Sequence, residues 1–302
     1  IENFALGSQD VSPVLLIPEK LYGRDAEIRL LQEVFERVVT TGEGGELILI
    51  SGYSGIGKSA LVNELHKSIV ELKGIYLSGK FEQFRRDVPY GTLADALGGL
   101  VRQILTCSAG EMAVWRDIIL KAVGEHGRLL TDLIPALGMV IGEQAPVGEL
   151  PPAEAENRFF SVFRKFMVAI ATAEHPLVLF FDDLQWLDAG SLKLFQYLFE
   201  HGRLPYFLLI GAYRDNEIGP SHPLNMVLEG LEKAGSRIHR VHLMPLPEKE
   251  VCGLLADTLL CTPERVQALA ELVHEKAAGN PFFTLQFISE VYDEGLFECN
   301  PE

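Results

Sequence analysis

A lysine and a serine end a glycine-rich segment early in the chain, where residues 52–59 read GYSGIGKS. The segment matches the pattern G-x-x-x-x-G-K-[ST] in full, and it lies between the apolar run LILI and a segment with helical periodicity. Glycines allow backbone conformations in which successive N–H groups converge on phosphate oxygens at a helix N-terminus. The segment therefore predicts a phosphate-binding loop rather than a simple glycine-rich turn.

The lysine and the serine have separate expected parts in nucleotide chemistry. Lys58 would place a positive charge against the β and γ phosphates. Ser59 would offer its hydroxyl to Mg²⁺, a cation that keeps several water ligands and needs few from the protein. The cofactor-binding residues predicted in this loop are Gly52, Gly55, Ile56, Gly57, Lys58, Ser59 and Ala60.

Two aspartates follow the apolar run PLVLFF and supply the other side of the predicted metal site. We expect Asp182 to ligate Mg²⁺ together with Ser59, and Asp183 to orient or deprotonate the attacking water. Paired aspartates after a strand can also cap a helix. Downstream of a phosphate loop we interpret them as site residues, and Asp188 is the better cap for the next helix.

Arg214 stands at the end of a later strand-like run, in IGAYRDNE. In proteins with a phosphate-binding loop, the expected sheet order places that strand beside the Asp182 strand. Arg214 could then reach the γ phosphate. The alternative is an ion pair with Asp215 or Glu217. The sequence alone does not decide between the γ-phosphate contact and the ion pair.

Composition limits the classes of partner. The 302 residues carry a formal net charge of −16, which disfavours nucleic acid, because binding to a phosphate backbone depends on clustered Lys and Arg. The apolar runs are far shorter than the roughly 20 residues that span a bilayer. The four cysteines are scattered, which predicts neither disulfides nor a zinc site and favours the cytoplasm. Because the chain begins with Ile1, we expect it to be a piece of a longer protein.

Hydrophobic periodicity predicts an α/β fold. An amphipathic helix is expected over 25–41. After it, a strand over 46–51, the loop, a helix over 59–73 and a strand over 74–81 form a βαβ unit. Residues from about 90 to 175 have a helical pattern, interrupted by a predicted surface loop at 144–156. The runs 176–183 and 206–214 are typical of central strands of a parallel sheet, and 237–243 is a plausible last strand.

The division into domains follows from these elements. Residues 1–20 would be a linker or N-terminal arm, 21–245 a P-loop domain built as a three-layer αβα sandwich, and 246–302 an all-helical lid that we expect to be truncated. Pro247 and Pro263 lie near predicted helix starts in the lid, and Gly279 would end a helix there.

Six segments together resemble a known family: LYGRDAEI, GYSGIGKS, GKFEQFRRDVPY, LFFDDLQWLD, LLIGAYRDNE and GNPFF. In this order they are similar to the STAND branch of AAA-type ATPases. The ATPase modules of large bacterial signalling proteins are the most similar, and in those proteins a serine/threonine kinase domain precedes the module while GAF and histidine-kinase domains often follow. The resemblance covers roughly residues 15–295 and implies adenine rather than guanine as the base.

The resemblance also implies further site residues. Tyr22 and Arg24 would lie beside the adenine, and Pro281 would close the site from the helical domain. Taken from the residues alone, Asn280 and Pro281 are only a good helix start, and the two following residues, Phe282 and Phe283, are expected in the core.

The sequence departs from fuller members of the family in two ways. A complete winged-helix domain is not present, which leaves tight trapping of ADP open. No clear arginine finger is found either: Arg85 and Arg86 are candidates by charge, with a solvated face as the alternative interpretation.

These observations lead to a functional hypothesis with two alternatives. The chain would be an ATPase module, using ATP/ADP and Mg²⁺, that hydrolyses slowly and couples nucleotide state to attached kinase or sensor domains of a cytoplasmic signalling protein. Nucleotide-dependent self-association is a further possibility in this hypothesis. The alternatives are a stand-alone ATPase with steady turnover and a non-hydrolysing interaction scaffold.

Overall fold

The computed structural model of the chain describes residues 17–294. Most of the predicted arm, the last residues of the predicted lid and Cys299 lie outside this range. The chain forms two compact units, which are described separately below. The larger unit comprises Ala26–Ser54 and Lys58–Leu243; of the described residues, the smaller comprises 17–25, Gly55–Gly57 and 244–294.

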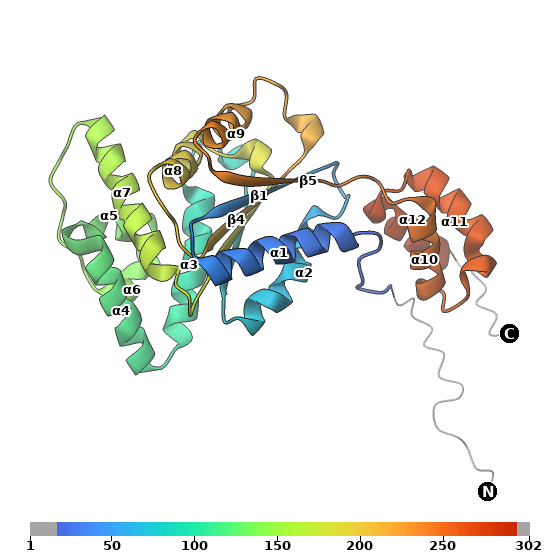
Figure 1. The fold of residues 1–302 in the computed structure, drawn as a ribbon, viewed down its shortest axis with the longest axis horizontal. Coiled ribbons are helices and arrows are strands. Elements are labelled where there is room, and N and C mark those ends of the chain that lie inside the picture. Colours follow the sequence, from blue (N-terminus) through green and yellow to red (C-terminus); the bar gives the residue numbers. More distant parts are fainter. Residues whose placement is uncertain (1–16, 295–302) are drawn as a thin grey trace, which may run out of the picture. The chain divides into compact units, whose positions relative to one another are not determined.

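A five-stranded parallel sheet forms the centre of the larger unit (Figure 1). The order of the strands is β2-β3-β4-β1-β5, and every neighbouring pair is parallel. This confirms the predicted α/β fold with a central parallel sheet, including the last strand. The strands are β1 (Glu46–Ser51), β2 (Ile75–Lys80), β3 (Leu177–Asp182), β4 (Phe207–Tyr213) and β5 (Arg237–His242).

Helices cover both faces of this sheet, which explains why its central strands are almost wholly apolar. Leu47 and Leu49 of β1 pack in one core cluster with side chains of α3 (Gly91–Thr106), α7 (Pro152–Ile170), α8 (Ala189–Glu200) and α9 (Pro223–Lys233). Ile48 and Ile50 point to the opposite face, because side chains alternate along a strand. Helices α1 (Asp25–Thr41) and α2 (Lys58–Glu71) lie on this second face (Figure 1), and their fully buried side chains are outside that cluster.

The helical insertion between β2 and β3 is present as the sequence predicts. It contains α3, α4 (Ala109–Val123), α5 (Gly127–Leu133), α6 (Gly138–Ile141) and α7, of which α4 to α7 gather at one end of the larger unit (Figure 1). The predicted loop at 144–156 is too long. Helix α7 begins at Pro152, because proline is well suited to the first turn of a helix, where its missing N–H would have no partner.

Three helices with a core of their own form the described C-terminal part of the smaller unit, the region predicted to be a lid. They are α10 (Glu248–Thr258), α11 (Pro263–Ala277) and α12 (Pro281–Asp293), and their buried residues pack together with Tyr22. Pro247 precedes α10 and Pro263 begins α11, as predicted. Gly279 follows α11 with a φ of 68°, a conformation that favours glycine at a helix end.

The prediction that Phe282 and Phe283 belong to the core is wrong. Their exposed fractions are 56% and 54%. In α12 the buried positions are Thr284 and Ile288, four residues apart on one face of the helix, and the two phenylalanines lie off that face.

Candidate nucleotide-binding site

The predicted phosphate loop connects the end of β1 to the start of α2. Gly55 and Gly57 have φ angles of 77° and 100°, in a region that side chains rarely adopt, so the loop conformation depends on glycine. Ile56 between them is buried, and Ala60 lies in the first turn of α2. The strand, loop and helix therefore follow one another as the phosphate-loop pattern requires.

Lys58 is folded back over this loop. Its Nζ donates hydrogen bonds to the carbonyl oxygens of Gly52 at 2.7 Å and Tyr53 at 2.9 Å, and only 7% of the residue is exposed. Burial lowers the pKa of the lysine, and the nearby carboxylate of Asp182 opposes that shift. The ammonium group is thus held inside the loop, where a phosphate group would be a stronger, charged acceptor than a carbonyl.

Ser59 and Asp182, which are predicted to share a metal ion, are in direct contact. Ser59 Oγ donates a hydrogen bond to Asp182 Oδ2 at 2.7 Å, and Asp182 Oδ1 accepts one from the Asp183 N–H at 2.9 Å. A hydroxyl and a carboxylate are oxygen ligands of the kind that Mg²⁺ prefers. Within residues 17–294 no group of three or more His, Cys, Asp and Glu side chains is arranged to hold a metal.

Asp183 is buried and surrounded by donors. It is 3% exposed, has a φ of 56°, and its Oδ1 accepts a hydrogen bond from Gln185 Nε2 at 2.9 Å. Its Oδ2 lies 3.2 Å from Lys80 Nζ, without the geometry of a hydrogen bond. Asp183 caps no helix with its side chain. The better cap is Asp188, which accepts a hydrogen bond from the Ser191 N–H of α8, as the sequence predicts.

Arg214 follows β4, which pairs with β3 as expected. The guanidinium lies 2.8 Å from Glu217 Oε1, so one of the predicted ion pairs is formed. It also lies 3.2 Å from Asp183 Oδ1, and its Cζ is 5.2 Å from the centre of the Trp186 ring. The structure therefore brings the predicted water-orienting carboxylate and the predicted phosphate sensor into direct contact.

Sequence reasoning missed Lys80 and Gln185. Lys80 is the last residue of β2 and pairs in register with Asp182, so a comparison of charged residues at strand ends would have found it. Gln185 lies in a short 3₁₀ helix after β3, and no sequence pattern indicates that its side chain turns inward.

The candidate arginine fingers have different surroundings. Arg85 forms an exposed ion pair with Asp95 at 3.0 Å, which agrees with a solvated face. Arg86 is also exposed, but its Nη2 donates a hydrogen bond to the main-chain oxygen of Gln185.

Three residues implied by the resemblance belong to the smaller unit. Tyr22 donates its hydroxyl to Asp257 Oδ2 at 2.7 Å, and burial together with this contact raises the pKa of the tyrosine. Arg24 donates a hydrogen bond to the Met244 carbonyl oxygen at 2.5 Å. Pro281 is the first residue of α12, after the capping residue Asn280. A position beside the adenine stays a prediction for all three.

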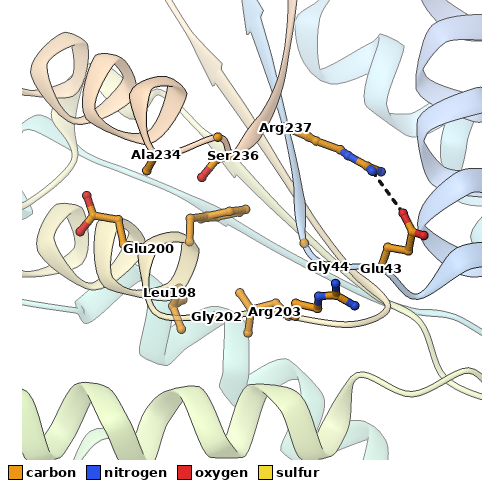
Figure 2. A pocket seen from close by; sticks show the side chains of 13 residues that line it. Glu43, Gly44, Leu198, Glu200, Gly202, Arg203, Ala234, Ser236 and Arg237 are labelled. Atoms are coloured by element: carbon orange, nitrogen blue, oxygen red, sulfur yellow. Dashed lines mark hydrogen bonds and ion pairs between the residues drawn. The ribbon is translucent and has the colours of Figure 1, made fainter.

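A separate pocket of about 270 Å³ lies at the opposite edge of the sheet (Figure 2). Arg237, the first residue of β5, and Gly45, which precedes β1, are among its lining residues, which places it at the amino ends of the strands. The phosphate loop and the two aspartates, Asp182 and Asp183, lie at the carboxyl ends of the strands. None of the predicted site residues lines this pocket.

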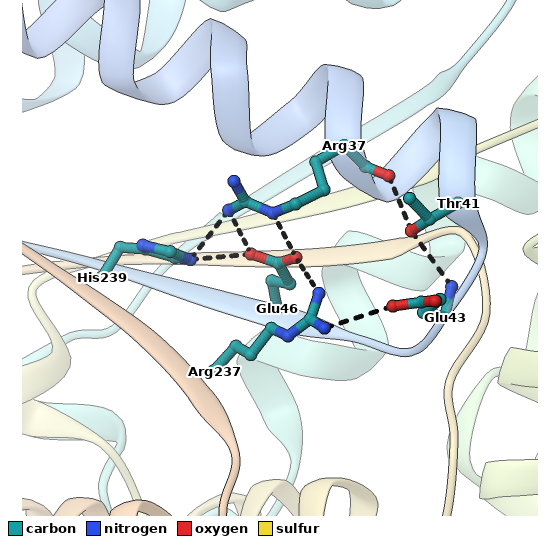
Figure 3. Close-up of polar contacts among 6 residues, drawn as sticks. All are labelled: Arg37, Thr41, Glu43, Glu46, Arg237 and His239. Carbon is teal, nitrogen blue, oxygen red and sulfur yellow. Dashed lines mark hydrogen bonds and ion pairs between the residues drawn. The ribbon is translucent and has the colours of Figure 1, made fainter.

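Beside this pocket, a buried carboxylate contacts two arginines and a histidine (Figure 3). Glu46 is 2% exposed and accepts two hydrogen bonds from Arg37, at 2.9 and 2.7 Å. His239 Nε2 lies 2.7 Å away and Arg237 Nη1 3.3 Å away. Burial alone would raise the pKa of Glu46, but these partners together lower it to about 2.

The fold and the site define a P-loop nucleotide-binding protein. Residues 20–210 match the family described as AAA ATPase domain, and the chain belongs to that family. In a structure of Drosophila ORC bound to DNA, a chain with 13% identity shares the fold with a TM-score of 0.52, over 98% of this chain and 65% of that one.

Two curated relatives are histidine kinases. "Hybrid signal transduction histidine kinase G" of Dictyostelium discoideum is 28% identical over an alignment of 359 residues, which covers 98% of this chain and 10% of that protein. "Histidine protein kinase 1" of Candida albicans is 28% identical over 200 residues, covering 61% of this chain and 8% of that protein. The chain therefore spans about a tenth or less of these relatives. Within the described residues, no helix has the length and apolar character needed to cross a membrane.

Proposed function

We propose that the chain is an ATP-binding switch module that hydrolyses ATP slowly and couples its nucleotide state to attached signalling domains. The observation that carries this proposal is the 2.7 Å hydrogen bond between Ser59 Oγ and Asp182 Oδ2, next to a buried Lys58. It joins the phosphate loop to the acidic end of β3, the two parts that phosphoryl transfer needs side by side.

Each residue of the site has a part in the proposed hydrolysis. Ser59 and Asp182 would hold Mg²⁺, which neutralises phosphate charge when bound. Lys58 would bind the β and γ phosphates, and Asp183 would orient the attacking water. Arg214, which contacts Asp183, would respond to the γ phosphate. Tyr22, Arg24 and Pro281 are proposed to bind or enclose the adenine.

The proposed output rests on the relatives. Two histidine kinases contain a similar segment within much longer chains, which supports kinase or sensor domains attached to this one in a longer cytoplasmic protein. Membership of the STAND branch, a serine/threonine kinase in the parent chain and nucleotide-dependent self-association are finer parts of the same proposal. A switch of this kind requires ATP and ADP to favour different arrangements of the module.

A substitution of Lys58 tests nucleotide binding. We expect Lys58→Ala to weaken binding of Mg·ATP by roughly 10- to 150-fold, because a hydrogen bond to a charged group contributes about 1.5–3 kcal/mol. Binding is measured by calorimetry, and any nucleotide released on denaturing the purified protein is identified by chromatography. Lys67→Ala is the matched control, since Lys67 is an exposed lysine of the same helix. Equal affinities in the two variants would refute the proposed site.

A non-hydrolysing module is a second candidate, and one observation favours it. Asp183 is buried and contacts both Arg214 and Lys80, so its carboxylate is occupied by two cations. A protein that binds Mg·ATP but releases no phosphate over many hours would support this candidate.

A further inference from the structure

Gln185 is a buried polar residue whose amide group is satisfied at both ends. Only 2% of it is exposed. Its Nε2 donates a hydrogen bond to Asp183 Oδ1 at 2.9 Å, and its Oε1 accepts one from the main-chain N–H of Arg214 at 3.2 Å. A buried amide is costly unless both of its ends are paired, so this side chain is held in one orientation.

The main chain of Gln185 is fixed as well. Its carbonyl oxygen accepts a hydrogen bond from Arg86 Nη2 and lies 3.2 Å from His222 Nε2. Arg86 belongs to the segment between β2 and α3, and His222 is the capping residue before α9. This one residue therefore ties the end of β3 to the end of β4 and to two neighbouring segments.

We propose that Gln185 is a positioning residue that sets the orientation of the Asp183 carboxylate and links it to the position of Arg214. This inference rests on the proposed function, in which Asp183 orients water and Arg214 senses the γ phosphate. It adds that one side chain, that of Gln185, fixes both the orientation of the Asp183 carboxylate and the position of Arg214.

The chemistry of the contact explains why an amide suits this position. The terminal torsion of an aspartate side chain is broad, so hydrogen bonds decide how its carboxylate is turned. Gln185 gives Oδ1 a neutral donor. Oδ1 also lies 3.2 Å from Arg214 Nε and Oδ2 lies 3.2 Å from Lys80 Nζ, so without the amide donor the two cations alone would decide how the carboxylate is turned. The orientation of the carboxylate decides where its remaining lone pairs point, and therefore where a water molecule can donate to it.

Gln185→Glu replaces the donor with a carboxyl group of the same shape. At pH 8 the introduced carboxylate faces Asp183 as a like charge, and we expect the ATPase rate at saturating Mg·ATP to fall at least tenfold, with nucleotide affinity changed less than about threefold. Burial beside another carboxylate raises the pKa of the introduced group. As the pH falls to about 5.5 the protonated carboxyl donates to Asp183 Oδ1, and the rate should recover toward that of the unchanged protein.

Two further variants complete the test. Gln185→Leu cannot donate at any pH, so its low rate should not recover in acid. Gln196→Glu is the control, because Gln196 also donates to a carboxylate, Glu200, at 2.9 Å but on an exposed helix face. We expect its rate and pH profile to match those of the unchanged protein. A Gln185→Glu rate equal to the unchanged protein at pH 8, or a loss without recovery in acid, would overturn the inference.

A measurement without nucleotide separates this inference from the proposed function. The Arg214 N–H should exchange with solvent faster in Gln185→Leu than in the unchanged protein, because the accepting Oε1 is gone. Equal exchange rates would overturn the bridge between Gln185 and Arg214 whatever the ATPase activity. An unchanged protein that neither binds nor hydrolyses ATP, with the predicted change in exchange present, would instead refute only the proposed function.

Discussion

Glu46 has the most strongly perturbed carboxylate among the residues that the structure describes, and its effect on stability has a definite sign. Its pKa is about 2 in the folded protein against an ordinary value of 4.5. Ionised Glu46 therefore stabilises the fold above about pH 4.5, and this contribution is lost as the pH falls from there toward 2. The difference corresponds to about 3 kcal/mol.

We expect Glu46→Gln to lower the free energy of unfolding by about 3 kcal/mol at pH 7, because Arg37 and His239 lose a buried charged partner. Urea denaturation at pH 7 and at pH 3 measures the effect, which should shrink at the lower pH. Glu43→Gln is the control. Glu43 contacts Arg237 but is 59% exposed, so its change should stay below about 1 kcal/mol. Similar losses in the two variants would contradict this account.

The residues of the candidate site differ in how far sequence could predict them. Ser59 follows from the spacing of the glycine-rich motif and Asp182 from its place at the end of an apolar run, and the structure joins them with a hydrogen bond. Gln185 could not be predicted, because its inward orientation depends on the Arg214 N–H, which is 29 positions away in sequence. Phe282 was predicted wrongly, since hydrophobicity alone does not tell which face of a short helix is covered.

Among the elements, α8 depends on a cap that also ties down another segment. Asp188 Oδ1 accepts hydrogen bonds from the Ser191 N–H at 2.8 Å and the Tyr90 N–H at 3.2 Å, and Ser191 Oγ donates to its Oδ2 at 2.6 Å. The residue is 5% exposed. One carboxylate therefore holds the start of α8 beside the entry to α3.

We expect Asp188→Ala to reduce the free energy of unfolding by about 2 kcal/mol, the upper end of the range for lost caps, because the buried Ser191 N–H and the partly buried Tyr90 N–H both lose their acceptor. Ser108→Ala removes the exposed capping box of α4 and should cost about 0.5–1 kcal/mol. Thermal or urea unfolding compares the two. A larger loss for the Ser108 variant would show that burial of the cap does not matter.

The elements themselves were largely predictable, because buried parallel strands have near-continuous apolar runs. β1, β3 and β4 fit that pattern. The start of α7 was misplaced because Pro151 and Pro152 were both assigned to a loop, whereas only Pro151 lies outside the helix. A proline signals a boundary of a helix without showing on which side of it the helix lies.

At the scale of the whole molecule, the proposed switch predicts that nucleotide changes the distance between the two units. Native cysteines permit the measurement: Cys107 of the larger unit is exposed, Cys261 of the smaller unit is partly exposed and Cys252 is buried. With Cys299→Ser, spin labels on Cys107 and Cys261 should give different distance distributions with ADP and with a non-hydrolysable ATP analogue. Lys58→Ala should abolish that difference. Identical distributions in the unchanged protein would contradict the switch.

The sheet order also governs how the chain can be assembled. β1 lies between β4 and β5, so residues 46–51 have no strand neighbour until residues 207–213 have been synthesised. β2 likewise waits for β3, on the far side of the helical insertion. Closing such long loops is slow, whereas helices form from local contacts. We therefore expect the sheet that carries the candidate nucleotide site to form late in folding, and a nascent chain that ends before β4 leaves β1 without a neighbouring strand.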